Sequence, residues 1–271
     1  MLSKLIGYEF KATRRIFLPA FGVLLLLSLV NAIFIALPDT LLDRVEMPFG
    51  VLMTVYLLAL FAVCVLALAY VINRFYKNLL GDEGYLMFTL PVRPSQLIWS
   101  KCIAATIWMI VAAVICFVSL LLLALPSLVV QNAIIASDLW KILQLAAGML
   151  LNNNGAYLIV FFELIVVGIV CVANFCMHVY ACLSLGSLAN RHRLGFAFLA
   201  YLLFGIAQEI ALLLASWLFS LIGWNIPISL SLDAVTALQL ALLLWLAYTA
   251  VCLAVNFLIT NYILSRHLNL Q

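Results

Sequence analysis

Six long apolar stretches, separated by short polar segments, make up most of the chain. They run over approximately residues 16–37, 51–73, 97–125, 156–185, 195–222 and 235–264. A helix needs about 20 residues to cross a hydrocarbon core about 30 Å thick, and each stretch is long enough. The pattern predicts an all-α integral membrane protein with six transmembrane helices, in a single domain over residues 1–271.

The composition agrees with the membrane class and excludes others. Of the 271 residues, 68% are hydrophobic and only 8% are charged. The net charge of +3 gives no support for a nucleic-acid partner. The seven cysteines contain no CxxC pair, so we expect no disulfide framework and no zinc site. The histidines are far apart and the patterns HExxH and GxSxG are missing, so an intramembrane enzyme is not expected.

The distribution of Lys and Arg predicts the orientation. Eleven of the 13 cationic residues fall on one side of the six predicted spans, and only Arg44 and Lys141 fall on the other. Because basic loops stay in the cytoplasm, we expect both termini to be cytoplasmic in a multi-pass protein of the plasma membrane.

The first 15 residues predict a basic amphipathic helix that lies in the membrane surface. Pro19 follows early in the first span and would let the two segments meet at an angle. This helix either only fixes the topology or acts as an elbow between the membrane body and a moving partner. Its cationic residues are Lys4, Lys11, Arg14 and Arg15, and all except Arg14 share one stripe with Tyr8.

The stretch between the third and fourth spans, Pro126 to Gly155, is only moderately apolar. Ser137 and Asp138 can cap a short helix there, and the run from Asn152 to Gly155 can end it. We interpret it as an amphipathic helix on the outer surface, with a re-entrant element as the alternative.

The polar segment from Arg74 to Lys101 predicts a cytoplasmic loop with a short helix between the second and third spans. Gly81 breaks the preceding helix, and Asp82 and Glu83 suit the start of a new one. The next residues form an apolar cluster that ends at Pro91: Tyr85, Leu86, Met87, Phe88 and Leu90. Such a cluster either binds another protein or packs under the chain's own helices.

This loop resembles the cytoplasmic loop of ABC-2 type permeases, the membrane subunits of one class of ATP-binding cassette exporters, and in particular a subgroup from Gram-positive bacteria. The matching residues are Glu83-Gly84, Leu90-Pro91-Val92-Arg93, Leu97 and Lys101. The ending Asn261 to Leu270 is also similar to that subgroup. The link from Gly223 to Ala234 departs from the family, because it is too short for the re-entrant helices that many members carry there.

The resemblance implies that the loop holds the coupling helix, which docks into a soluble ATPase. It assigns this role to Asp82, Glu83, Gly84, Tyr85, Leu86 and Phe88. It also implies two ATPase copies that bind ATP and Mg, and a second permease half that is identical or different. This chain has no GxxxxGK[ST] motif of its own. The expected cargo is hydrophobic or amphipathic: a peptide, a lipid or a drug.

Several polar residues fall inside the predicted spans. Glu163, Asn174 and His178 lie within about 60° on one helix face, and Glu209 lies near the middle of the fifth span. They either line a pathway, pair differently in two states, or make interhelical hydrogen bonds. Asn31 and Asn256 are expected to join helices. A proton- or ion-coupled transporter that uses Glu163, His178 and Glu209 is the alternative function, and a non-transporting sensor or scaffold is another.

Overall fold

The computed structural model describes residues 2–37, 39–80, 93–130, 140–141, 144–145, 148, 155–189, 192–221 and 234–266. The side chains of residues 39–48, 127–130, 218–221, 234 and 266 lie outside this description. Within the described residues every regular element is helical, and six helices are long and apolar enough to cross a membrane. The elements are α1 (Leu2–Ile35), α2 (Asp39–Phe75), η1 (Tyr76–Leu80), α4 (Pro94–Val130), α6 (Ala156–Gly186), α7 (Arg193–Leu221) and α8 (Ala234–Arg266). The predicted all-helical, six-span class is therefore confirmed.

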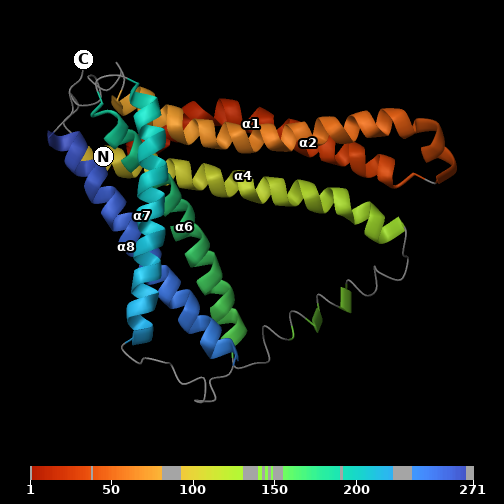
Figure 1. Cartoon of the computed structure of the whole chain (residues 1–271). Coiled ribbons are helices and arrows are strands. Elements are labelled where there is room, and N and C mark those ends of the chain that lie inside the picture. The colour runs from red at the N-terminus through yellow and green to blue at the C-terminus, as the bar shows by residue number, and fades with distance from the viewer. Residues whose placement is uncertain are drawn as a thin grey trace.

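The six long helices form two arms that meet at one end (Figure 1). In the first arm α1 packs along α4, and α2 packs against both. In the second arm α6 packs between α7 and α8. The arms touch through α6, which contacts α2 and α4, and through α8, which contacts α4.

The predicted N-terminal surface helix is not a separate element. α1 runs without interruption from Leu2 to Ile35, with Pro19 inside it. Tertiary packing explains the continuity, because aromatic rings from both sides of the predicted boundary pack on one partner, Trp108 of α4. The ring of Phe10 lies 5.7 Å from that of Trp108, and the ring of Phe17 is stacked on it at 4.7 Å.

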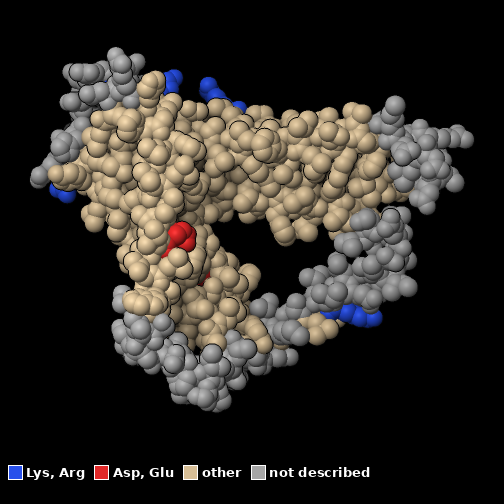
Figure 2. Space-filling view, viewed as in Figure 1, with Lys and Arg blue, Asp and Glu red and all other residues tan. Residues whose placement is uncertain are grey.

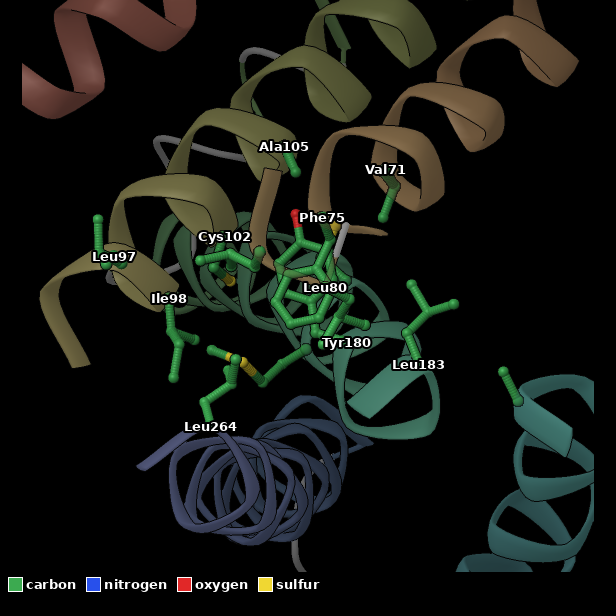
Figure 3. Close-up of a cluster of buried hydrophobic side chains, with 14 residues drawn as sticks. Val71, Phe75, Leu80, Leu97, Ile98, Cys102, Ala105, Tyr180, Leu183 and Leu264 are labelled. Atoms are coloured by element: carbon green, nitrogen blue, oxygen red, sulfur yellow. The ribbon is translucent and has the colours of Figure 1, made fainter. Parts of the chain in front are cut away.

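The largest buried cluster lies where the arms meet. Figure 3 shows side chains from α2, α4, α6 and α8 converging there, among them Phe75, Tyr180 and Leu264. The rings of Phe75 and Tyr180 are stacked with centroids 4.2 Å apart. Because lipid tails are as apolar as these side chains, close packing holds such a junction together.

Small residues allow a close contact between α6 and α7. A Cβ built on Gly186, at the end of α6, would lie 2.5 Å from the Cβ and 2.7 Å from the Cα of Ala197 in α7. The missing side chain therefore lets the two helices touch, as is common in membrane bundles.

The start of α1, the end of α8 and most of the described basic side chains lie where the arms meet. Figure 1 places these two helix ends there, and Figure 2 shows blue side chains around them. The ends of helices that lie there carry Lys4, Lys11, Arg14, Arg15, Arg74, Lys77, Arg93, Lys101 and Arg193. We call this the basic end. Its assignment to the cytoplasm stays a prediction.

The stretch between α4 and α6 is described only in part. Residues 140–141, 144–145 and 148 are helical, and Trp140 and Leu145 are exposed. The choice between a surface helix and a re-entrant element stays open. The last link, residues 222–233, lies outside the described residues.

Candidate functional site

Three helices of the first arm meet at one carboxylate near the basic end. Glu9 of α1 is 6% exposed. Its Oε1 atom accepts a hydrogen bond from Nζ of Lys101 in α4 at 2.8 Å, and its Oε2 atom accepts one from Nε of Arg74 in α2 at 2.6 Å. The Lys101 side chain is 2% exposed and that of Arg74 is 30% exposed. We call these three residues the charge cluster.

The charge cluster holds its helices together because each charge depends on the others. Removing a charged group from water costs several kcal/mol, and only close, well-oriented partners offset that cost. Removing one member of a buried pair costs about 3–5 kcal/mol, since it leaves an uncompensated charge. Glu9 therefore fixes the positions of both α2 and α4 relative to α1.

The charge cluster lies on both sides of the predicted coupling loop. Arg74 is in the last turn of α2, and the π-helical turn η1 follows it and ends at Leu80. The chain is described again from Arg93, and α4 begins at Pro94, two turns before Lys101. Proline suits this first helical position, where its missing N–H is not needed. The two helices that enter and leave residues 81–92 are thus tied to one carboxylate.

Contacts of Lys101 continue from the charge cluster to the second arm. The Tyr180 hydroxyl of α6 donates a hydrogen bond to the backbone carbonyl of Lys101 at 3.4 Å. The same Tyr180 ring is stacked on Phe75, one residue after Arg74. A continuous set of contacts therefore runs from α1 through α2 and α4 to α6.

A second polar group joins the helices of the other arm. Nδ2 of Asn256 in α8 donates to Oδ1 of Asn174 in α6 at 3.0 Å, and Nε2 of Gln208 in α7 donates to Oδ1 of Asn256 at 3.5 Å. The Tyr248 hydroxyl donates to the backbone carbonyl of Gln208 at 3.0 Å. Asn256 therefore joins helices as predicted, and the contacts of Asn174 favour the same interhelical role.

Asn31, the other predicted interhelical residue, lies fully buried in α1. Its Nδ2 donates to the backbone carbonyl of Leu52 in α2 at 3.3 Å, and to that of Leu27 in its own helix at 2.9 Å. The prediction for Asn31 is confirmed.

The structure does not bring Glu163, His178 and Glu209 together. His178 is buried, stacked on Phe204 at 5.4 Å. Glu163 is half-buried, and its Oε2 has no hydrogen-bond partner within the described part of the chain. Glu209 is exposed on α7. No hydrogen bond or ion pair joins these three residues where the chain is described.

An apolar cavity of about 480 Å³ lies between α2, α6 and α7. Leu68, Val71, Phe175 and Phe198 line it. His178 lies directly behind its wall, because two further lining residues, Cys182 and Tyr201, contact the imidazole. Sγ of Cys182 lies 3.8 Å from Nε2 of His178, and the Tyr201 ring packs edge-on at 5.0 Å.

The other predicted site residues fall into two groups. Lys4, Lys11, Arg14 and Arg15 are all exposed on the first four turns of α1. The predicted coupling residues Asp82, Glu83, Gly84, Tyr85, Leu86 and Phe88 lie outside the described residues. The search for three or more neighbouring His, Cys, Asp or Glu side chains that could hold a metal ion finds none among the residues described.

Sequence reasoning missed Glu9. The available signal was its position four residues before Thr13 and eight before Phe17. This spacing places an acid on the stripe that α1 buries, away from the basic stripe. An acidic residue on the buried side of a basic helix needs a cation from another helix.

Comparison of the chain with protein families, with curated proteins and with solved structures finds no match. The helices themselves define the class. Six helices of suitable length and hydropathy make this a multi-pass α-helical membrane protein.

Proposed function

We propose that this chain is the membrane-spanning permease subunit of an ATP-binding cassette exporter of the bacterial plasma membrane. A separate soluble ATPase supplies ATP hydrolysis, and a second permease half completes the transport pathway. The observation that carries the proposal is the charge cluster: one buried carboxylate holds both helices that flank the predicted ATPase-docking loop. The resemblance of residues 83–101 to ABC-2 type permeases supports the same function.

A loop that transmits the movement of a docked protein needs a rigid connection to the membrane helices. Arg74 and Lys101 provide it in the proposed mechanism, because their shared contact with Glu9 makes α1, α2 and α4 move together. The stacked pair Phe75 and Tyr180 then carries the movement to α6 and the second arm. Closure of the ATPase dimer would thus change how the two arms meet, and the interface between the permease halves opens outward.

The apolar cavity supports an apolar or amphipathic cargo. Its lining is almost wholly hydrocarbon and aromatic, with Leu68, Phe175 and Phe198 on facing helices. Ligand sites of this composition bind through burial of apolar surface, with few polar groups to orient the ligand. The cavity also lies beside the junction of the arms, where the proposed movement would change its shape.

Capture of the ATPase tests the proposal. The tagged chain is purified from its native host in mild detergent, and bound proteins are identified by mass spectrometry with an ATPase assay on the eluate. We expect a stoichiometric partner with a Walker A motif, lost from Glu83→Lys and from Phe88→Asp. Lys141→Glu is the control on the predicted outer side, because it exchanges the same two side chains in the opposite direction and so changes the net charge by two units, and it should retain the partner.

A wild-type eluate without an ATPase would contradict the proposal. In that case the ion-coupled alternative would be tested next, with Glu163→Gln and Glu209→Gln in proton-flux assays on vesicles. Retention of the ATPase and of transport in both loop variants would reject the loop as the docking site.

A further inference from the structure

A groove between α1 and α2 has one polar and one apolar end. Its volume is about 290 Å³. Asn73, Arg74 and Lys77 line the end of the groove that belongs to the basic end, and Ile16 and Leu66 line the other end. Leu66 and Lys77 are 11 residues apart on a continuous helix, so the groove extends about 16 Å along it.

The groove adjoins a basic surface on α1. This surface is formed by Tyr8, Lys11 and Arg15, and Ala12 borders both it and the groove. Four cationic residues therefore border one continuous surface. Among these four, Arg74 also donates a hydrogen bond to the buried carboxylate of Glu9.

The order of these residues along α1 and α2 matches a phospholipid. The polar end of the groove lies at the basic end of the molecule (Figure 2), and a basic helix end is expected to lie at the level of lipid headgroups. The apolar end lies further along both helices, and Ile16 beside it is 56% exposed. A phosphate at the basic end would place its acyl chain against apolar side chains in the direction that a lipid leaflet imposes.

We propose that this groove binds an anionic phospholipid. The headgroup phosphate contacts Lys77 and Arg74, with Lys11 and Arg15 adding attraction from the adjoining surface of α1. The upper part of one acyl chain lies along Ile16, Leu66 and Ala69. Charge complementarity favours an anionic over a zwitterionic lipid, and the apolar end favours a lipid over a free phosphate ion. The proposal needs only the membrane class and is independent of an ATPase partner.

Native mass spectrometry tests the proposal on the full-length protein. The chain is prepared with equal amounts of phosphatidylglycerol and phosphatidylcholine of identical acyl chains, and the ratio of the two retained lipids is measured. One cation near the surface contributes about fivefold to anionic lipid binding. We therefore expect Lys77→Gln and Arg15→Gln each to lower the phosphatidylglycerol preference by about that factor.

Two further variants distinguish lipid binding in the groove from general electrostatic attraction of anionic lipid to the basic helix. Arg14→Gln removes the same charge from the same helix at a residue that lines neither the groove nor the adjoining surface, and should leave the ratio unchanged. Ala69→Trp fills the apolar end without changing charge, and should lower retention of phosphatidylglycerol. Inorganic phosphate at the same concentration should not displace the lipid.

Three results would overturn the proposal. An equal loss of phosphatidylglycerol preference in Arg14→Gln would mean that the lipid is attracted to a diffuse basic surface. An unchanged ratio of the two lipids in Lys77→Gln, Arg15→Gln and Ala69→Trp would show that the groove does not bind the lipid. Displacement by inorganic phosphate would mean a site for free anions. Since no ATPase enters this measurement, its failure and that of the proposed function are distinguishable.

Discussion

Glu9 and Lys101 form a buried ion pair although 92 positions separate them in the chain. Their side chains are 8% and 2% exposed, and the atoms in contact are 2.8 Å apart. Arg74 shares the carboxylate from a third helix, so the first arm is held by charge at its basic end and by aromatic packing further along. The shared carboxylate therefore fixes how α1, α2 and α4 meet at this end.

The charge cluster predicts an unequal cost for removing its members. Glu9→Gln should lower the free energy of unfolding by about 3–5 kcal/mol, because it leaves Lys101 charged and buried. Lys101→Met should cost less, since Glu9 keeps its contact with the partly exposed Arg74. Unfolding in mixed micelles of SDS and a mild detergent measures both values.

The double variant Glu9→Gln/Lys101→Met provides the control. It should be more stable than Glu9→Gln alone, because it also removes the buried ammonium that has lost its carboxylate. The double-mutant cycle gives the coupling energy between the two residues. Strictly additive costs would show that the pair contributes no coupling energy.

Much of this fold follows from hydropathy, because crossing a bilayer constrains length and composition strongly. The six predicted spans each fall within one observed helix or reach at most two residues past its end. The helices are longer than the spans, as in α2, which begins at Asp39, whereas the predicted span begins at residue 51. Hydropathy marks the part in hydrocarbon, and the helix continues beyond it.

The pairing of helices could not be predicted in the same way. Apolar side chains face lipid as well as protein, so apolar periodicity does not identify the packed face. The partners Asn174 and Asn256 lie 82 positions apart, and nothing local links them. Glu9 was missed because its partners come from two other helices. α1 passes Pro19 without a break because Trp108 packs on Phe17 before it and on Phe21 after it.

The close contact of α6 and α7 predicts sensitivity at one glycine. Gly186→Ala should lower the free energy of unfolding by about 1–3 kcal/mol, because its Cβ would meet the backbone of Ala197, which cannot move aside cheaply. Thermal unfolding in detergent, followed by circular dichroism, measures the change. Gly168→Ala is the matched control in the same helix, since its Cβ meets nothing within 4 Å, and it should keep or raise the melting temperature. Equal shifts in both variants would mean that the contact is not tight.

The hydrogen-bonded side-chain amides of the second arm, Asn174, Gln208 and Asn256, predict a modest loss of stability on substitution. The partners share this loss. Asn256→Val should destabilise the protein by about 0.6–1.7 kcal/mol, the range for interhelical hydrogen bonds in membranes. Asn174→Val in the same background should add little, because its partner has already gone. Full additivity of the two substitutions would show that their hydrogen bond does not contribute. Thr249→Val serves as a control, since among the described residues its hydroxyl bonds to carbonyls of its own helix alone.

The gathering of basic residues predicts which end faces the cytoplasm, and this decides whether an ATPase can reach the loop. In a cysteine-free background, Arg93→Cys should react with a membrane-impermeant maleimide only after the cells are opened, because basic segments stay inside. Lys141→Cys, on the opposite side of the predicted membrane, should react in intact cells. A green fluorescent protein fused to the C-terminus should fluoresce, since it matures in the cytoplasm. Labelling of Arg93→Cys in intact cells would place residues 81–92 outside, where no cytoplasmic ATPase can bind them. That result would contradict both the predicted topology and the exporter proposal.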